Sequence, residues 1–307
     1  MKTRSIGSLT VSVVGVGCNN FGARLDEVRT GEVVEAALDA GITFFDTADT
    51  YGDQQSEEFL GRSLGARRDD VVVATKFGVP VPDGAGAAPE YVHRACEASL
   101  RRLGTDRIDL YQLHAPDDSV PIADTLGALH ELVDEGKVRE IGCSNFTAAQ
   151  LAEAETAAKD RARFRSVQNQ YSLLWRAPED DGVLAACASY DLALLPYYPL
   201  ANGLLTGKVV RGEPPPKGTR LAALPAERRG HWLSDELLGR VESIRAIADA
   251  HGVSMLSLAF SWLLSKEAVA SVIAGASSPV QVRANAAAPV SLPEGVLDEL
   301  DRASKAS

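Results

Sequence analysis

The stretch ITFFDTADTYG, residues 42–52, joins a short apolar run to a polar turn, and the same pattern recurs along the chain. Seven further runs of β-branched or aliphatic residues alternate with longer segments of helical periodicity. The strands predicted in this way are 13–17, 42–45, 71–75, 108–113, 138–142, 166–168, 193–197 and 271–274. Nearly continuous apolar runs are typical of parallel strands buried on both faces. Eight of them, each followed by a helix, predict an α/β protein with a (β/α)8 TIM barrel.

Two of the intervening segments carry clear helix signals. Apolar and small residues repeat at helical spacing from Val92 to Leu103, and Gly104 predicts the end of that helix. In the next segment, Pro121 predicts the first turn and Gly136 the end. Since no linker interrupts the repeat, residues 1–307 are expected to form one barrel domain rather than two domains of about 150 residues.

Two longer segments break the repeat. Residues 78–89 are rich in Gly, Pro and Ala, and residues 202–231 contain Pro214, Pro215 and Pro216. Loops that follow the strands of a barrel lie at its C-terminal face, where active sites are built, and long ones often cover them. We expect long active-site loops here, with 202–231 as the lid, although both segments could also be surface filler.

Composition narrows the class of protein. The net charge of −11 disfavours binding to nucleic acid or to an anionic membrane surface. No signal peptide and no apolar run of about 20 residues is evident, so a cytoplasmic protein is expected. The four scattered cysteines and five histidines form no CxxC or HExxH pattern, and no metal site is predicted. A monomer that acts on a small molecule is the default expectation.

Polar side chains stand at the C-terminal ends of three successive predicted strands. Asp46 follows the run 42–45 and Tyr51 lies five residues later, while Lys76 and His114 end the next two runs. Taken alone, each has a structural explanation, such as a turn former or a buried histidine. In a closed barrel, however, all four would meet at one mouth.

This set suits the delivery of a proton to a carbonyl group. Asp46 would keep Lys76 charged, and the ammonium of Lys76 would lower the pKa of Tyr51 and allow it to exchange a proton near neutral pH. His114 could orient the carbonyl oxygen. Because a proton alone reduces nothing, a hydride donor is also required.

Four motifs resemble those of the aldo-keto reductase superfamily, in the same order: FFDTADTYG (44–52), ATK (74–76), DLYQLH (109–114) and GKVREIGCSNF (136–146). The likeness extends from about Gly15 to Asn285. It implies a barrel that binds a nicotinamide dinucleotide without a Rossmann domain and reduces aldehydes and ketones to alcohols. It also implies Tyr51 as general acid and base, tuned by Lys76 and Asp46, with His114 orienting the carbonyl.

The resemblance further implies a cofactor site that is built from strand ends. At the nicotinamide end it places Ser144, Asn145 and Gln168 on the carboxamide and the ring of Tyr197 on the nicotinamide. The remaining residues implied for the cofactor are Gly17, Cys18 and Asp46 beside the nicotinamide, Pro199, Leu200 and Gly203 under the pyrophosphate, and Gly275, Ser277, Ser278, Gln281 and Asn285 around the adenosine.

The choice between NADP(H) and NAD(H) is less direct. Many relatives carry a lysine where Gly275 stands and an arginine where Gln281 stands, and both contact the additional phosphate of NADP. Here Arg283, or Ser277 and Ser278 together with free N–H groups at a helix start, could take that role. NADP(H) is the expected cofactor.

Two other functions remain open. Lys76 could form a Schiff base in aldol chemistry, as strand-end lysines do in other barrels. Alternatively, the chain could be a cofactor-sensing regulatory subunit with little turnover, as relatives associated with ion channels are. The substrate is not predicted, but apolar loop residues such as Phe21, Phe77, Trp175 and Trp232 suggest a pocket that accepts aromatic or aliphatic carbonyl compounds.

Overall fold

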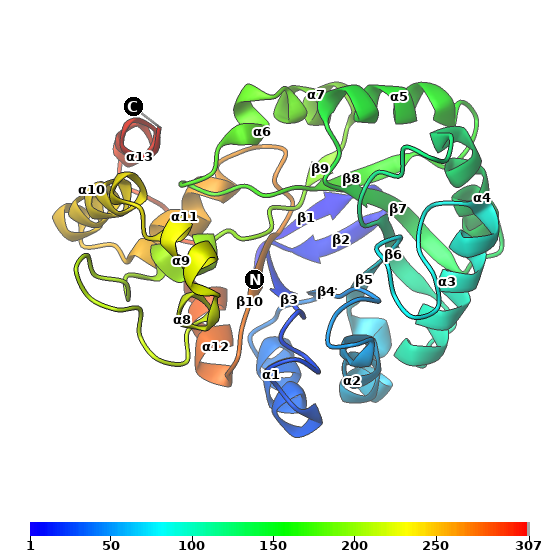
Figure 1. The fold of residues 1–307 in the computed structure, drawn as a ribbon, viewed down its shortest axis with the longest axis horizontal. Helices are drawn as coiled ribbons and strands as arrows, with labels where there is room; N and C mark the ends of the chain where they lie inside the picture. Colours follow the sequence, from blue (N-terminus) through cyan, green and yellow to red (C-terminus); the bar gives the residue numbers. More distant parts are fainter. Residues whose placement is uncertain (306–307) are drawn as a thin grey trace.

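A parallel eight-stranded sheet forms the centre of the computed structural model, which describes residues 1–305. The strands follow the order β10-β3-β4-β5-β6-β7-β8-β9 (Figure 1). The ring closes where Leu194 pairs with the segment before β10, through hydrogen bonds from its N–H to Ala268 O (2.6 Å) and from Ala270 N–H to its carbonyl (3.1 Å). The predicted (β/α)8 barrel is confirmed. Its strands are β3 (Val14–Gly17), β4 (Phe44–Asp46), β5 (Val72–Phe77), β6 (Ile108–Leu113), β7 (Val138–Ser144), β8 (Phe164–Gln168), β9 (Ala193–Leu194) and β10 (Val272–Gly275).

One strand is shorter than predicted. The sequence analysis expected residues 193–197, but regular pairing of β9 ends at Leu194. Pro196 has no N–H and cannot contribute a ladder hydrogen bond at its position. The chain nevertheless stays against β8, because Tyr197 N–H donates to Asn169 O at 3.1 Å. Tyr197 therefore still reaches the C-terminal mouth of the barrel.

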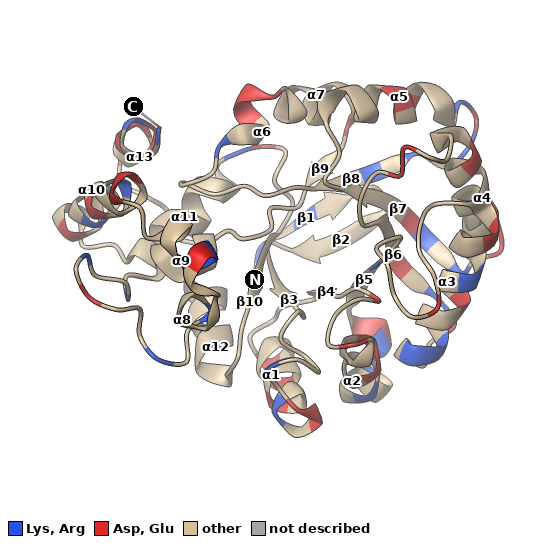
Figure 2. Ribbon diagram, viewed as in Figure 1, with Lys and Arg blue, Asp and Glu red and all other residues tan. Residues whose placement is uncertain are grey.

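Helices surround the barrel, and many of the charged residues belong to these outer helices and to the loops between elements (Figure 2). The helix predicted to end at Gly104 does so, with that glycine at φ 62°. The next helix begins directly after Pro121, which is its N-cap rather than part of its first turn, and ends before Gly136. The helices of the ring are α1 (Glu27–Asp39), α2 (Gln55–Leu64), α3 (Pro89–Leu103), α4 (Ile122–Asp134), α5 (Ala148–Ala158), α6 (Ala177–Asp180), α7 (Val183–Tyr190), α10 (Asp235–His251), α11 (Met255–Leu264), α12 (Pro279–Ala287) and α13 (Val296–Ser304).

An antiparallel hairpin that the sequence analysis did not predict closes the N-terminal end of the barrel. Its strands are β1 (Thr3–Ile6) and β2 (Leu9–Ser12). The side chains that the hairpin contributes pack against inward-facing residues of the barrel strands and form an apolar cluster inside the ring. The cluster contains Ile6, Leu9, Val11, Phe44, Val72, Ala74, Leu110, Leu195, Ala270 and Ile273. This end of the barrel is therefore dry, and polar chemistry is confined to the opposite end.

The segment 202–231 is only partly a loop. It begins inside the 3-10 helix η2 (Ala201–Thr206) and contains α8 (Arg220–Ala223) and most of α9 (Ala226–Trp232). The Thr219 side chain caps α8 by accepting from Ala222 N–H. By contrast, the chain from residue 78 to the start of α3 stays irregular apart from an isolated bridge between Val81 and Gly84.

Within residues 1–305, no single helix is both long and apolar enough to cross a membrane. Helices α10 and α11 reach that length and apolarity only when taken together, and they meet at a bend of 98°.

Close packing of α2 on α3 gives a testable prediction for Gly61, which lies inside α2. A Cβ atom there would press into the backbone oxygen of Leu103 at the end of α3. Alanine normally favours a helix over glycine by up to about 1 kcal/mol, but overpacking of this kind costs about 1–3 kcal/mol. We expect Gly61→Ala to lower the free energy of unfolding measured by urea denaturation.

Gly31 in α1 provides the matched control. A Cβ there has only Ser63 Oγ within 4 Å, at an ordinary 3.8 Å. Gly31→Ala should therefore leave stability unchanged or raise it by up to about 1 kcal/mol. Equal stabilisation by both substitutions would show that α2 and α3 pack less closely than described.

Candidate active site

The four residues predicted to act together do meet at the C-terminal mouth of the barrel. Asp46 ends β4, Lys76 lies in β5, His114 follows β6, and Tyr51 lies in the turn before α2. Lys76 Nζ donates to Asp46 Oδ2 and to Thr47 O, both at 2.7 Å. The same nitrogen lies 5.1 Å from the centre of the Tyr51 ring, which meets His114 edge-on with ring centres 6.0 Å apart.

The ion pair between Lys76 and Asp46 is buried, with exposed fractions of 0% and 3%. Burial by itself lowers the pKa of Lys76, but the charge of Asp46 and contact with Tyr51 raise it above the ordinary value. The expectation that Asp46 keeps Lys76 charged is therefore supported. The second carboxylate oxygen, Asp46 Oδ1, accepts from Gln168 Nε2 at 2.9 Å and from Gln112 Nε2 at 3.2 Å.

The expectation of a lowered pKa for Tyr51 is wrong. Burial raises the pKa of the phenol above its ordinary value, and the positive charge of Lys76 only partly opposes this. Asp46 adds to the rise because it offsets much of the field of Lys76. Tyr51 is consequently a neutral hydroxyl at neutral pH, able to donate a proton rather than present a phenolate.

His114 is also neutral. Burial, followed by the nearby charge of Lys76, lowers the pKa of its imidazole to about 3. Its Nδ1 has no hydrogen-bond partner among the described residues. A neutral imidazole has one N–H donor and one acceptor, so His114 can direct an N–H toward a carbonyl oxygen.

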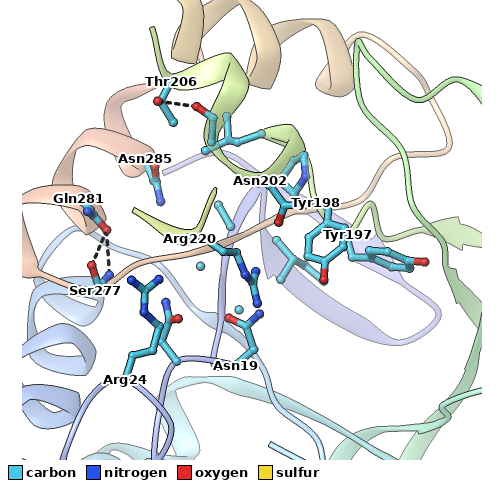
Figure 3. Close-up of a pocket in the computed structure, with 18 of the residues that line it drawn as sticks. Asn19, Arg24, Tyr197, Tyr198, Asn202, Thr206, Arg220, Ser277, Gln281 and Asn285 are labelled. Atoms are coloured by element: carbon cyan, nitrogen blue, oxygen red, sulfur yellow. Dashed lines mark hydrogen bonds between the residues drawn. The ribbon is translucent and has the colours of Figure 1, made fainter. Parts of the chain in front are cut away.

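A cavity of about 770 Å³ runs from Tyr51 and His114 to the start of α12, and Figure 3 shows part of its lining. Most of the residues implied for a cofactor line it. They are Gly17, Asp46, Ser144, Asn145, Gln168, Tyr197, Pro199, Leu200, Gly203, Gly275, Ser277, Gln281 and Asn285.

At one end of the cavity, amide groups are held by a fixed network. Asn145 adopts the left-handed conformation at φ 63° and donates from Nδ2 to Ser144 Oγ at 3.1 Å. Ser144 Oγ in turn donates to Gln168 O at 2.7 Å, and Asn145 Oδ1 accepts from the Tyr197 hydroxyl at 2.9 Å. These contacts bring the ends of β7, β8 and β9 to one wall of the cavity.

At the other end, the turn into α12 carries the polar groups. Ser277 donates from its N–H and its hydroxyl to Gln281 Oε1, at 2.8 and 3.2 Å (Figure 3). Ser278 does not line the cavity, because its hydroxyl caps α12 by accepting from Gln281 N–H. The prediction of Ser278 as a cofactor residue is thus not supported. Gly275 leaves room for the Asn19 side chain in the cavity wall, because a Cβ at position 275 would approach Asn19 Oδ1 to 3.2 Å.

Cys18 likewise does not line the cavity. Its side chain is fully buried, and Sγ donates to Val16 O at 3.6 Å. Successive residues of an extended segment point to opposite faces, so with Gly17 at the cavity Cys18 faces the surrounding helices. The four apolar residues suggested for the substrate pocket do not line the cavity either. Phe21 and Phe77 are buried in the core, and neither Trp175 nor Trp232 reaches the cavity.

The family model of the aldo/keto reductase family matches residues 13–305. The chain belongs to this family. A probable voltage-gated potassium channel subunit beta of Arabidopsis thaliana is 32% identical over 93% of this chain and 90% of its own. The probable aldo-keto reductase 1 of Glycine max is 35% identical, over 83% and 74%. The aldo-keto reductase yakc [NADP(+)] of Schizosaccharomyces pombe is 32% identical, over 87% and 80%.

Aldo/keto reductases are oxidoreductases that bind a nicotinamide cofactor, and the cavity of this family member fits such a group. Amide side chains lie at the catalytic end, and the N-terminus of α12 lies at the far end. Three cavity-lining cations that the sequence analysis missed, Arg24, Lys208 and Arg220, add positive charge. Asp46 is the single acidic side chain on the lining within the described residues, and Lys76 neutralises it.

Two of these cations make contacts between the segment 202–231 and other residues that line the cavity. Arg24 Nη2 donates to Gly218 O at 2.8 Å, and the Arg220 guanidinium lies 5.2 Å from the centre of the Tyr198 ring. Arg283, the arginine expected from the sequence, is exposed and does not line the cavity. The sequence contained a signal for two of these cations. Arg24 and Arg220 lie in segments that follow predicted strands, and such segments lie at the C-terminal face of a barrel.

The low pKa of His114 predicts that its imidazole stays neutral between about pH 5 and pH 8. We expect its ring signals in ¹H–¹⁵N NMR spectra to be constant over that range, with His114→Gln used to assign them. A transition of this histidine near pH 6.5, the value of a free imidazole, would contradict the described burial.

Proposed function

We propose that this chain is an NADP(H)-dependent reductase of aldehydes and ketones that also oxidises alcohols in the reverse direction. The observation that supports it most directly is the meeting of three groups at one end of the cavity. A neutral phenol, Tyr51, and a neutral imidazole, His114, lie beside the buried ion pair of Lys76 and Asp46.

The reaction needs a hydride, which the reduced nicotinamide supplies when bound. Tyr51 donates its hydroxyl proton to the carbonyl oxygen, and His114 orients that oxygen with its N–H. The ammonium of Lys76 stabilises the phenolate left on Tyr51, and Asp46 fixes the ammonium in place. Hydride and proton together convert the carbonyl to an alcohol, and Tyr51 recovers its proton from solvent.

The Schiff-base alternative has little support in this arrangement. A lysine that forms a Schiff base must reach the substrate as a free amine, which requires a lowered pKa. Lys76 is fully buried, does not line the cavity, and has a pKa raised by its contacts with Asp46 and Tyr51.

NADP(H) is the proposed cofactor because the cavity is positive in an otherwise acidic protein. Arg24, Lys208 and Arg220 line it, together with Ser277 and Gln281 at the start of α12 (Figure 3). The relative from Schizosaccharomyces pombe is named for NADP(+). The additional phosphate of NADP would gain charge-assisted hydrogen bonds from arginines here.

Replacing Tyr51 by Phe tests the proposed mechanism. The variant lacks only the hydroxyl, so reduction of an aldehyde should fall by at least about a hundredfold. The dissociation constant for NADPH, measured by fluorescence quenching, should change less than about threefold, because the phenol donates nothing to the cofactor. Near-full turnover by Tyr51→Phe would show that another group delivers the proton.

The preference for NADPH over NADH can be tested by replacing the two arginines that line the cavity. We expect the double variant Arg24→Met, Arg220→Met to bind NADPH at least about tenfold more weakly and NADH less so, because only NADPH carries the additional phosphate. Methionine retains the apolar stem of arginine. Arg283→Met is the matched control, since Arg283 lies off the cavity, and it should leave both affinities unchanged. Equal weakening for both cofactors would place the arginines on the shared pyrophosphate.

A second candidate function is regulatory, because relatives that cover most of this chain are named potassium channel subunits beta. On that proposal, the wild-type protein binds NADPH tightly and reduces carbonyl compounds only feebly. Absorbance at the nicotinamide band, followed with a panel of aldehydes, ketones and sugars, separates the two candidates. For the leading candidate we propose a cytoplasmic monomer whose partner is a small carbonyl substrate, without nucleic-acid or membrane contacts.

A further inference from the structure

Gln112 is a fully buried amide on the inner face of β6. Alternation along the strand places Leu110, Gln112 and His114 on the same face. Leu110 belongs to the apolar cluster inside the barrel, and His114 lines the cavity. Gln112 therefore lies between the dry bottom of the barrel and its reactive mouth.

The neighbouring strand makes room for this side chain. Gln112 pairs in register with Lys76 on one side and with Gly142 on the other. A Cβ at Gly142 would approach Gln112 Cγ to 3.2 Å and would press more closely on Ser166 Oγ. The glycine thus leaves space for a long polar side chain at a level where the barrel interior otherwise favours apolar packing.

Burying a polar amide this deep in the barrel costs free energy, so the presence of Gln112 requires an explanation. Oε1 of Gln112 has no partner among the described residues. Its Nε2 donates to Asp46 Oδ1 at 3.2 Å. Burying an unpaired carbonyl oxygen destabilises a protein, and a leucine here would avoid that cost while extending the apolar cluster.

Gln112 differs from Gln168, the other amide side chain that donates to Asp46 Oδ1. Asp46 Oδ1 also accepts from Gln168, but Gln168 and Asp46 both line the cavity. A bound nicotinamide would therefore compete for Gln168. Gln112 does not line the cavity, so its bond to Asp46 is kept whether or not a cofactor is present.

We propose that Gln112 is a positioning residue of the reductase, one that holds the Asp46 carboxylate oriented so that Asp46 keeps Lys76 against Tyr51. This inference rests on the proposed function for its effect on turnover. The titratable groups close enough to interact with the charge of Asp46 are Lys76 from β5, Tyr51 from the turn before α2, and Cys18 after β3. Of these, only Lys76 is charged near neutral pH, and it binds Asp46 Oδ2. The orientation of Oδ1 therefore depends on the two amides, of which Gln112 lies off the cavity and Gln168 lines it.

Two substitutions test this role. Gln112→Leu removes the donor, and we expect kcat to fall about tenfold with the NADPH dissociation constant unchanged. Gln112→Glu keeps the shape. Its carboxyl can donate to Asp46 only while protonated, so turnover relative to the wild type should be highest at acid pH and decline as pH rises. Gln168→Leu is the contrast, because it should weaken NADPH binding.

A readout without turnover separates this inference from the proposed function. In the ligand-free protein, the carboxyl carbon of Asp46, assigned with Asp46→Asn, can be observed by ¹³C NMR at one fixed neutral pH. Because Gln112 donates a hydrogen bond to this carboxylate, its chemical shift should change in Gln112→Leu. This result would support the inference even if the wild-type protein reduces no carbonyl compound.

Three outcomes would overturn the inference. The first is a Gln112→Leu protein with wild-type kcat and an unchanged chemical shift of the Asp46 carboxyl carbon. The second is a Gln112→Glu protein whose relative turnover is the same at every pH, since that indicates only a packing role. The third is weakened NADPH binding in Gln112→Leu, which would place Gln112 on the cofactor. If Gln112→Leu does not fold, the dependence of Gln112→Glu turnover on pH decides whether the inference holds.

Discussion

The buried ion pair between Lys76 and Asp46 is the constraint on which the site depends. An ammonium and a carboxylate removed from water are tolerated only when they are paired and their remaining hydrogen-bonding groups are satisfied. Here the pairing distance is 2.7 Å, Lys76 also donates to Thr47 O, and two amides serve the second carboxylate oxygen. Strands β4, β5, β6 and β8 must hold their register for these contacts to exist, so the barrel and the site support each other.

The barrel separates an apolar end from a polar end along its axis. At the N-terminal end, the hairpin of β1 and β2 completes an apolar cluster inside the ring. Above it lie Gln112 and the ion pair, and then the cavity with Tyr51 and His114. This order excludes water from below the reacting groups, which strengthens the electrostatic contacts among them. It also explains why both Tyr51 and His114 are neutral, because burial penalises their charged forms.

Charge is arranged differently on the outside and in the cavity. The chain carries a net charge of −11, yet Arg24, Lys208 and Arg220 line the cavity, and the one acidic side chain on its lining among residues 1–305 is neutralised by Lys76. A local positive potential of this kind attracts an anionic cofactor. The segment 202–231 supplies two of these cations and crosses the cavity.

The sequence by itself determined the barrel and the meeting of Asp46, Tyr51, Lys76 and His114. Apolar runs define strands locally, and the carboxyl ends of parallel strands converge in any closed barrel. Only the tertiary structure decided that Tyr51 has a raised pKa, because that depends on burial and on Asp46 offsetting Lys76. It also decided that Cys18 and Ser278 turn away from the cavity and that Arg24 and Arg220, rather than Arg283, line it. Side-chain direction and electrostatic balance arise from contacts between residues distant in the chain, and local pattern does not encode them.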